Sequence, residues 1–458
     1  MRFAAYPKYK PSGSEWLGDL PDQWNVKRGR FCMDVNPRSK RLRTLCPEDE
    51  VSFVPMEAVG EYGGLQLEHT RTIADVGAGY TEFDDGDVVV AKITPCFENG
   101  KGAMAEKLAN GAAFGTTELH VLRSTTVLER RFLFYFTISG LFRSLGEGAM
   151  YGAGGQKRVP PEFCENVRLP LPPTDEQRAI ADFLDRETAK IDTLVAKKRT
   201  LIERLKEKRT ALISLTVTRG LPPDAARAAG LDPHPNLKPS GIDWLGAVPE
   251  HWDVSRIKYL AKIESGHTPS RSVDEYWIDC TIPWVSLNDS GYLRTHDYIT
   301  ETVYNINGLG LANSSARMLP AQAVVFSRDA TVGLCAITTR PMAVSQHFVA
   351  YLCGPRLLPG YLLASLDVMG QHLVSLSLGA TIRTIGMDDV RSLACAVPPY
   401  PEQAAILDFL ARKKEQIDRM VERIEIAIER LQEYRSALIT AAVTGKIDVR
   451  GETNGGQI

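Results

Sequence analysis

The sequence predicts an α+β fold, in which two mixed α/β domains are separated by two long α-helices that form an antiparallel coiled coil with a pseudo-two-fold internal repeat. Two duplications indicate this organisation. The segment that starts at Pro172 recurs from Pro398, an offset of 226 residues (398 − 172). The segment that ends at Trp24 recurs up to Trp252, an offset of 228 residues (252 − 24). Two duplications at nearly the same offset predict that one larger unit occurs twice in the chain.

The tryptophan segments, residues 10–24 and 238–252, share Trp-Leu-Gly followed by Pro-x-x-Trp. Proline and glycine at fixed places predict a turn, and paired aromatic side chains are suited to anchor that turn on a neighbouring surface. We therefore interpret these tryptophans as structural anchors in preference to ligand contacts.

Each tryptophan segment is followed by short strand-like runs separated by Gly, Pro and Asp. In the first globular stretch we expect strands at 51–56 and 87–93 and a helix at 129–144. The second stretch has matching features, and we expect its strands at 282–286 and 323–328 and its helix near 358–369. The two stretches otherwise share little sequence, which predicts two domains of similar architecture with different surfaces.

The duplicated segment from Pro172 reads as one long helix in each copy. Thr174 with Gln177 forms a capping-box pattern, and Pro401 suits the first position of a helix. Apolar residues at alternating steps of four and three predict a coiled-coil seam, although each helix packing only on its own domain is the alternative. The predicted seam positions are Ile180, Leu184, Ile191, Leu194, Leu201, Leu205 and Leu212 in the first helix, and Ile406, Leu410, Ile417, Met420, Ile424, Leu431 and Leu438 in the second.

These elements give predicted domain boundaries along the chain. A stretch rich in Pro, Ala and Asp between the two copies suits a linker. The predicted segments are a first domain at 1–170, a helix at 171–220, the linker at 221–237, a second domain at 238–397, a helix at 398–446 and a tail at 447–458.

Composition favours a soluble intracellular protein of ordinary globular character. The net charge of −2 predicts that any basic surface is local. The most apolar stretch, residues 132–142, is too short to span a bilayer. The eight cysteines form no C-x-x-C pair, which argues against zinc and against a disulfide framework and fits a reducing cytoplasm.

Motifs of catalysis are incomplete in this sequence. Val397-Pro398-Pro399-Tyr400 resembles the N-P-P-Y loop of amino-methyltransferases, but Val397 cannot accept a hydrogen bond from a target amine. Gly445-Lys446 is followed by Ile447, without the hydroxyl that a P-loop needs to hold Mg²⁺. We therefore expect no catalytic residue and no metal site in this chain.

Two loops in each globular stretch combine cations, amides and hydroxyls with glycine or proline. Glycine lets backbone approach a ligand, Arg and Lys contact phosphates or guanine, and Asn and Gln can read adenine. Solvated loops are equally consistent with the spacing, but the presence of such loops in both stretches favours DNA contacts. The candidate DNA-binding residues are Lys92, Thr94, Asn99, Lys101, Gln156, Lys157, Arg158, Ser327, Arg328, Thr331, Arg383 and Thr384, the last two from the run 379–384.

Four features together resemble the specificity (S) subunit of type I restriction–modification systems, over about residues 9–447. They are the duplicated Pro-x-x-Glu-Gln helix, the tryptophan segments, Lys-Ile-Thr-Pro-Cys-Phe-Glu-Asn-Gly-Lys-Gly from residue 92, and Ser-Arg-Asp-Ala-Thr-x-Gly from residue 327. The two loop sequences are the most specific of the four.

The resemblance implies two target-recognition domains that each read one half of a bipartite, asymmetric target in double-stranded DNA. It implies that the helices set the spacer and dock two modification (methyltransferase) subunits, which carry S-adenosylmethionine. Restriction/translocase subunits with ATP and Mg²⁺ complete the implied complex, with no membrane. This chain itself would hold no cofactor. A coiled-coil scaffold that does not bind DNA, or an enzyme with unrecognised motifs, are the alternatives, and the resemblance does not specify the target sequence.

Overall fold

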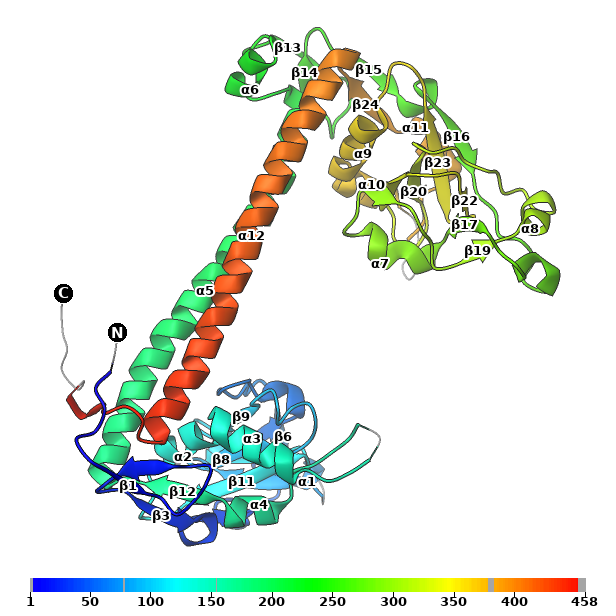
Figure 1. The fold of residues 1–458 in the computed structure, drawn as a ribbon. Helices are drawn as coiled ribbons and strands as arrows, with labels where there is room; N and C mark the ends of the chain where they lie inside the picture. Colours follow the sequence, from blue (N-terminus) through cyan, green and yellow to red (C-terminus); the bar gives the residue numbers. More distant parts are fainter. Residues whose placement is uncertain (1–2, 77–78, 154, 378–382, 452–458) are drawn as a thin grey trace. The chain divides into compact units, whose positions relative to one another are not determined.

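The computed structural model describes residues 3–76, 79–153, 155–377 and 383–451 (Figure 1). It divides into two units. The first unit comprises Met1–Arg199 and Glu425–Ile458, and the second comprises Thr200–Ile424. Each unit therefore combines one globular domain with one part of each long helix, so neither long helix belongs to a single unit.

The first unit closes its domain by pairing the beginning of the chain with the strand before the first long helix. Strand β1 (Tyr9–Pro11) pairs with β2 (Asp19–Pro21), and β3 (Asn25–Arg28) pairs with β12 (Arg168–Leu171), both antiparallel. The strands at the beginning and the end of the domain thus lie side by side, next to the start of the first long helix.

Two four-stranded sheets lie between these strands. One has the order β6-β5-β10-β7 and the other β4-β11-β8-β9. Val54, Phe83, Val89 and Val121 are fully buried in one apolar cluster that joins them. The strands are β4 (Met33–Val35), β5 (Glu50–Val54), β6 (Thr70–Thr72), β7 (Thr81–Asp84), β8 (Val88–Ala91), β9 (Gly102–Met104), β10 (Ala112–Gly115) and β11 (Leu119–Ser124).

The helix expected at 129–144 is two helices in the structure. Ser139 accepts a hydrogen bond from the backbone N–H of Phe142 and caps the second of them, which breaks the run in its middle. The helices of this domain are α1 (Ile73–Val76), α2 (Arg130–Thr137), α3 (Gly140–Ala149) and α4 (Pro161–Asn166).

The second unit repeats this plan. Strand β13 (Leu237–Pro239) pairs with β14 (Ala247–Pro249), and β15 (Asp253–Arg256) pairs with β24 (Ala394–Val397). A five-stranded sheet has the order β16-β23-β20-β21-β18, and a three-stranded sheet has the order β19-β17-β22. Their strands are β16 (Ala261–Ser265), β17 (Ile282–Val285), β18 (Tyr298–Ile299), β19 (Asn305–Ile306), β20 (Val324–Ser327), β21 (Cys335–Thr338), β22 (Ala343–Val344) and β23 (Phe348–Cys353).

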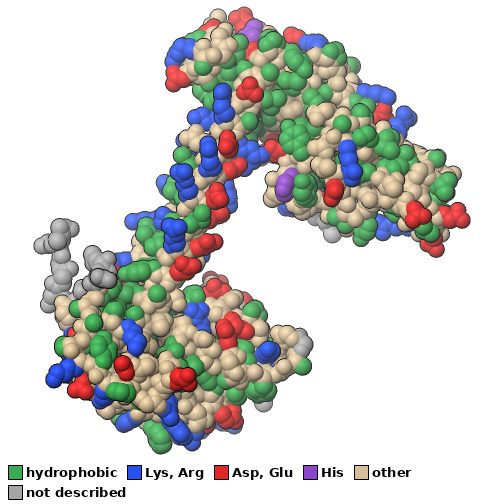
Figure 2. Space-filling model, in the orientation of Figure 1, with side chains coloured by type: hydrophobic (Ala, Val, Ile, Leu, Met, Phe, Trp, Pro, Cys, Tyr) green, Lys and Arg blue, Asp and Glu red, His purple; other side chains and the backbone are tan. Residues whose placement is uncertain are grey.

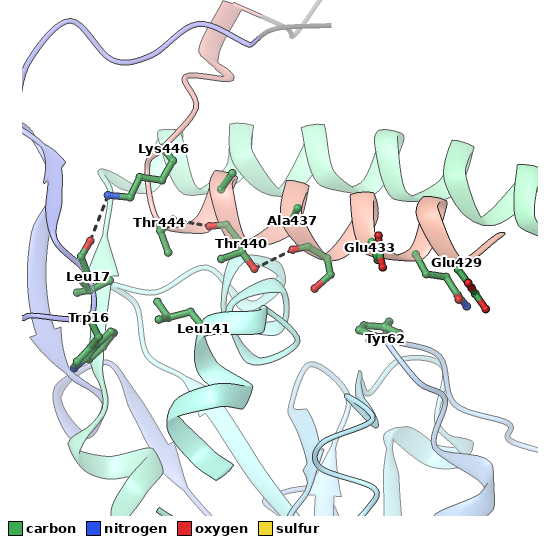
Figure 3. A pocket seen from close by; sticks show the side chains of 13 residues that line it. Trp16, Leu17, Tyr62, Leu141, Glu429, Glu433, Ala437, Thr440, Thr444 and Lys446 are labelled. Carbon is green, nitrogen blue, oxygen red and sulfur yellow. Dashed lines mark hydrogen bonds between the residues drawn. The ribbon is translucent and has the colours of Figure 1, made fainter. Parts of the chain in front are cut away.

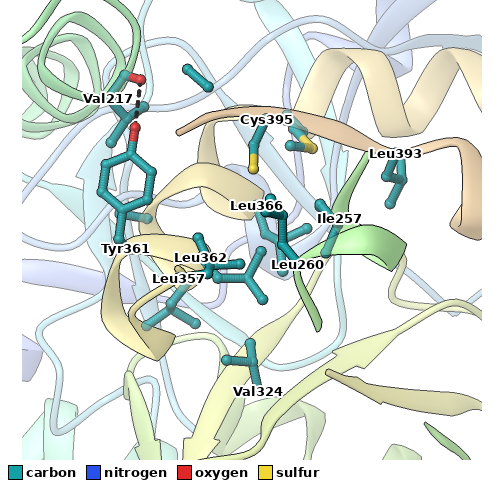
Figure 4. Close-up of a cluster of buried hydrophobic side chains, with 14 of the residues drawn as sticks. Val217, Ile257, Leu260, Val324, Leu357, Tyr361, Leu362, Leu366, Leu393 and Cys395 are labelled. Atoms are coloured by element: carbon teal, nitrogen blue, oxygen red, sulfur yellow. Dashed lines mark hydrogen bonds between the residues drawn. The ribbon is translucent and has the colours of Figure 1, made fainter. Parts of the chain in front are cut away.

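The core of the second unit includes the end of the first long helix. Figure 4 shows Val217 beside Tyr361, whose hydroxyl donates to the Val217 carbonyl oxygen at 3.1 Å. The predicted linker joins this core, since Leu221 and Ala226 are buried in it, so it is packed where the sequence suggested a flexible crossing. The helices are α6 (Pro223–Ala228), α7 (Ser290–Leu293), α8 (Gly308–Ala312), α9 (Pro359–Val368), α10 (Gly370–Leu376) and α11 (Met387–Ser392).

The two long helices are α5 (Thr174–Arg219) and α12 (Tyr400–Val443). They run antiparallel within each unit. In the first unit Arg435 contacts Asp192 at 3.1 Å, and in the second Arg209 contacts Asp418 at 3.3 Å. The repeat offset relates the two pairs, because 418 − 192 and 435 − 209 both equal 226. The internal repeat is therefore present in the helix contacts as well as in the sequence.

The seam between the helices differs from the predicted one. Leu194 and Leu201 are 43% and 46% exposed, while their neighbours Val195 and Ile202 are buried. Met420, the repeat counterpart of Leu194, is exposed in the same way. On one face of α5 the buried positions run Ile180, Leu184, Thr188, Ile191, Val195 and Ile202.

This sequence of positions contains two successive steps of four, from Ile180 to Leu184 and from Leu184 to Thr188. Such a stutter shifts the phase of a heptad pattern. The first turns of α5 are fixed by packing on the globular domain, where Phe183 is also buried, and the seam resumes in a new phase beyond them. The predicted positions Ile191, Leu205 and Leu212 remain at least partly buried, whereas Leu194, Leu201 and Met420 do not lie in the seam.

The exposed faces of the long helices carry both signs of charge, as Figure 2 shows. Lys190–Glu187 and Lys206–Glu203 are ion pairs three residues apart. Near the termini, Ala4 forms an antiparallel bridge with Asp448, so the first residues of the predicted tail are packed. Residues 452–458 of that tail lie outside the described residues. Among the helices that the structure describes, none is both long and apolar enough for a bilayer crossing.

Candidate nucleic-acid interface

The duplicated Glu-Gln of the long helices fixes each globular domain to its helix. The Gln177 side chain is buried; it accepts from Glu129 N at 2.7 Å and donates to the carbonyl oxygens of Val127 and Pro172. The expected capping box is therefore wrong, because α5 already includes Thr174 and Gln177 serves the domain. In the second unit Gln403 makes the corresponding bonds with Leu358, Arg356 and Pro398.

Glu176 and Glu402 bind the tryptophan segments. Glu176 accepts from the Tyr6 hydroxyl at 2.7 Å and from Trp24 Nε1 at 3.0 Å, and His251 Nε2 lies 2.8 Å from the Glu402 carboxylate. Trp24 and Trp252 are fully buried, which confirms the prediction that these two tryptophans are structural anchors. The Glu and Gln of the Pro-x-x-Glu-Gln motif thus attach each globular domain to the start of its long helix.

In the first unit the two candidate loops are brought together. The loop after β8 and the loop after α3 join through a bridge between Ile93 and Arg158. Thr94 N donates to Lys157 O at 3.0 Å, and Val159 N donates to Lys92 O at 2.9 Å. Residues more than fifty positions apart therefore present one surface, which we call the first loop pair (residues 92–101, 151–153 and 155–159).

The candidate side chains of the first loop pair divide into two groups. Asn99, Gln156 and Lys157 are exposed, and Lys92 is partly exposed. By contrast, the Thr94 hydroxyl donates to Lys157 O at 3.0 Å, and Lys101 Nζ donates to Met56 O at 3.0 Å. The first group is available to a ligand, whereas the second holds the loops in shape.

Arg158 makes a side-on ion pair with Glu118, which the sequence did not single out. Arg158 Nε and Nη2 donate to the two carboxylate oxygens at 2.9 and 2.7 Å. These bonds hold the pKa of the Glu118 carboxyl below its usual range, and the charge of Lys92 acts in the same direction. The only sequence signal for Glu118 is its place directly before the strand that becomes β11.

The second unit builds the same loop arrangement with other side chains. The second loop pair (residues 327–334 and 383–386) is joined by a bridge between Asp329 and Thr384. Ala330 N donates to Arg383 O at 2.8 Å, and Ile385 N donates to Arg328 O at 2.9 Å. Residues 379–382 of the predicted run lie outside the described residues. Of the run's two remaining residues, Arg383 is exposed and Thr384 is partly buried.

The two loop pairs are equivalent in their backbone hydrogen bonds. Lys92 N donates to Glu118 O at 2.9 Å, and Arg328 N donates to His347 O at 2.9 Å. Lys92 and Arg328 therefore occupy one structural position, and Glu118 and His347 occupy another. The two loop pairs thus have the same backbone support and different side chains.

Ser327 is a correction to the candidate DNA contacts. Its side chain is fully buried, and its hydroxyl donates to Asp329 O at 3.1 Å and lies 3.1 Å from Thr331 Oγ1. Thr331 Oγ1 in turn lies 3.3 Å from Ser290 Oγ. Ser327 therefore stabilises the loop from within, because no part of its side chain reaches the surface.

Sequence reasoning missed two residues that complete the second loop pair, Gln346 and His347. His347 Nδ1 lies 3.0 Å from the Asp329 carboxylate. Arg328 Nε donates to the Gln346 carbonyl oxygen at 3.3 Å and lies 3.8 Å from Asp329. Arg328, at the position of Lys92, is thus held mainly by backbone, and the position of Arg158 is occupied by Thr384.

The first loop pair is also tied to α12. Tyr62 N donates to Gly100 O at 2.9 Å. Arg143 donates to the Tyr62 hydroxyl at 2.9 Å, to Glu98 O at 3.2 Å and to Ser436 Oγ at 3.2 Å. A groove of about 900 Å³ lies beside this contact, lined by Trp16, Leu141 and the small side chains of α12 (Figure 3).

Within the described residues, no group of three or more His, Cys, Asp or Glu side chains is placed to hold a metal ion. The eight cysteines form no disulfide, and Cys164 and Cys395 are buried, which raises the pKa of both thiols to about 12. These thiols are poor nucleophiles because so little thiolate is present near neutral pH.

Comparison with known proteins gives a family match over most of the chain. A family model described as the type I restriction modification DNA specificity domain matches residues 78–204 and 249–430. The specificity subunit of the type I restriction enzyme EcoAI of Escherichia coli is 40% identical over 164 residues, covering 35% of this chain and 27% of that protein. The corresponding EcoEI subunit of Escherichia coli is 38% identical over 176 residues, covering 38% and 29%.

The alignments thus span less than a third of the length of these two curated relatives. A solved structure from work on complex assembly and conformational transition of the type I R-M system has a TM-score of 0.64 at 18% identity. It covers 93% of this chain and 98% of its own, which shows that the fold is shared along nearly the whole length.

Proposed function

The chain belongs to the family of type I restriction modification DNA specificity domains, and we propose that it is the sequence-recognition subunit of a type I restriction–modification complex. In this proposal each unit reads one half of a bipartite, asymmetric target in double-stranded DNA. The long helices set the spacer between the halves and dock the modification subunits. The chain itself catalyses no reaction.

The observation that carries the proposal is the pair of equivalent loop arrangements. Both are built on the same backbone bonds, and both present cations: Lys92 and Arg158 in the first, Arg328 and Arg383 in the second. Cations position a protein on phosphates, whereas the edges of bases are read by side chains that differ between readers. One scaffold used twice with different side chains suits an asymmetric target.

The exposed apolar residues of the long helices support a docking role. Leu194 and Met420 are repeat counterparts, and both are exposed. Single exposed apolar residues are common on protein surfaces, so the support comes from their occurrence at the same repeat position in both long helices. Because the repeat duplicates them, they suit two copies of the same partner, which we take to be two modification subunits.

The remaining parts of the proposed complex lie outside this chain. The modification subunits would hold S-adenosylmethionine, and restriction/translocase subunits would hold ATP and Mg²⁺. This division of labour fits a chain whose methyltransferase-like loop begins with Val397, a side chain that cannot accept a hydrogen bond.

The test is reconstitution with a modification subunit encoded beside the chain, followed by single-molecule sequencing of methylated DNA. We expect one bipartite motif with a fixed gap, and no methylation by either polypeptide alone. Replacing residues 25–168 by the corresponding domain of a relative should change one half of the motif. A change in both halves, or methylation by this chain alone, would contradict the proposal.

A further inference from the structure

We propose that Glu118 is a positioning residue that holds Arg158 for end-on recognition of a guanine in the half-site read by the first unit. The inference rests on the proposed function, because it assigns a base to one part of the first loop pair. Glu118 has no role in the sequence motifs; the hydrogen bond from Lys92 N to its backbone oxygen and the contact of its carboxylate with Arg158 place it at this surface.

The geometry of the pair determines which edge of Arg158 remains for a ligand. A guanidinium has five N–H donors in a fixed plane. Nε and one N–H of Nη2 point to the Glu118 carboxylate, at 2.9 and 2.7 Å. The other edge, formed by Nη1 and the second N–H of Nη2, makes no hydrogen bond with a side chain or backbone group in the described parts of the chain.

That second edge matches guanine. Guanine presents two acceptors, O6 and N7, in the major groove, and a bidentate arginine is the commonest specific contact to them. A carboxylate bound along the other edge fixes the plane of the guanidinium, so less side-chain entropy is lost on binding. Glu118 thereby favours a planar base edge over the many orientations in which a mobile arginine could bind phosphate.

The position of Arg158 suits this task. Its side chain is 37% exposed. Its backbone is fixed by two hydrogen bonds with Tyr151: Arg158 N donates to Tyr151 O at 2.9 Å, and Tyr151 N donates to Arg158 O at 3.1 Å. Lys157, the neighbour in sequence, is exposed and suited to a phosphate. The loop therefore offers one restrained cation beside one mobile cation.

The second unit provides the contrast. At the position of Glu118 it has His347, which contacts Asp329 at 3.0 Å. At the position of Arg158 it has Thr384, because Asp329 bridges Thr384 as Ile93 bridges Arg158, so neither member of the Glu118–Arg158 pair has the same side chain in the second unit. The inference therefore applies to one half-site only, and His347→Gln is the matched control in the other.

The experiment measures base preference at every position of the target. Wild type, Glu118→Gln, Arg158→Lys and His347→Gln are each assembled with the modification subunits and selected against randomised duplex DNA at fixed salt. We expect Glu118→Gln and Arg158→Lys to relax the same G·C position of one half-site, by roughly tenfold or more. His347→Gln should leave that half-site unchanged.

A second measurement separates positioning from folding. Because Glu118→Gln removes a negative charge near phosphates, affinity for non-specific DNA should stay equal or rise while the base preference falls. A misfolded variant would lose both. Arg158→Lys keeps the charge and should also keep non-specific affinity.

The outcomes distinguish this inference from the proposed function. If wild type selects a bipartite motif and both first-unit variants keep every base preference, the Glu118 assignment is wrong. Relaxation at an A·T position, or in both half-sites, would also overturn it. If wild type selects no motif, the proposed function itself fails, whatever the variants do.

Discussion

At the scale of single residues, the most informative side chains are those that serve the backbone of another segment. Gln177 and Gln403 each satisfy three backbone groups, two in the neighbouring domain and one just before their own helix. Both are fully buried, where an unpaired backbone group costs roughly 1–3 kcal/mol. Their energetic role is therefore to join a domain to a helix rather than to form either one.

Replacing Gln403 by Ala should lower the stability of the second unit by about 1–3 kcal/mol, because Leu358 N and two carbonyl oxygens lose their partner. The measurement is the denaturation midpoint of the full chain. Gln432→Ala, at an exposed glutamine of the same helix, is the matched control and should shift it little. Equal shifts for both variants would contradict the joining role.

The Glu118–Arg158 pair predicts a small pH dependence. In the folded chain the pKa of the Glu118 carboxyl lies below the ordinary value of about 4.3. The pair therefore stabilises the fold fully above about pH 4.3 and progressively less as pH falls through the lower folded value. Because the pair is partly exposed, the effect should be below about 1 kcal/mol.

Between pH 7 and about pH 3, wild type should thus lose more stability than Glu118→Gln, which lacks the titrating group. Glu106→Gln replaces an exposed carboxylate that makes no ion pair with a described residue, and it should follow wild type. Denaturant midpoints across this pH range provide the comparison. Parallel curves for wild type and Glu118→Gln would show that the ion pair does not contribute to stability.

At the scale of elements, the long helices are stabilised by a seam whose phase is set by the domains. The stutter after Leu184 places Val195 and Ile202 inside and Leu194 and Leu201 outside. The same shift occurs in α12, where Met420 lies outside and Ile428 inside. The exposed set is then free for partners without loss of helix pairing.

Two isoleucines of α12 test the phase of this seam. Ile428 is 9% exposed and Ile426 is 41% exposed. Ile428→Ala should cost about 2 kcal/mol or more, because it leaves a cavity in packed surroundings. Ile426→Ala removes the same atoms from a more exposed face and should cost much less. Thermal unfolding of the two variants decides between them, and a larger loss for Ile426→Ala would refute the assigned seam.

At the scale of the whole molecule, the chain is one plan used twice. The repeat relates Asp192 to Asp418 and Arg209 to Arg435, and both ion pairs cross between the same two helices. Each unit takes its helices from distant parts of the sequence. The first unit is therefore built from two separate stretches of chain, whereas the second is one continuous stretch, Thr200–Ile424.

If the helices set the spacer, as we propose, their length must determine the gap in the target. Adding one heptad to both α5 and α12, after Leu201 and after Ala427, keeps the helices matched and lengthens each by roughly 10 Å. Since duplex DNA advances about 3.4 Å per base pair, the gap should grow by about three pairs with unchanged half-sites.

Methylated-motif sequencing before and after the insertion is the measurement. Adding the heptad to α5 alone is the control, because it mismatches the antiparallel contacts and should reduce stability without giving a defined longer gap. An active double-insertion variant with the original gap would show that the helices do not measure DNA.

The sequence by itself determined the two-fold plan, the long helices and the loops. These follow from periodicity and repetition, which are local properties of a chain. The family resemblance determined the expected partners, and the family match confirms the resemblance.

Only the tertiary structure decided which side chains the loops present and which helix face is buried. Ser327 reads as a ligand contact in sequence and is buried in the fold. Glu118 belongs to no sequence motif, yet its carboxylate contacts Arg158, forty residues away in the sequence. Leu194 and Val195 are both apolar, and sequence could not choose between them because packing of α5 on the domain sets the phase. Contacts between distant segments depend on how the backbone brings them together, and no local pattern records that.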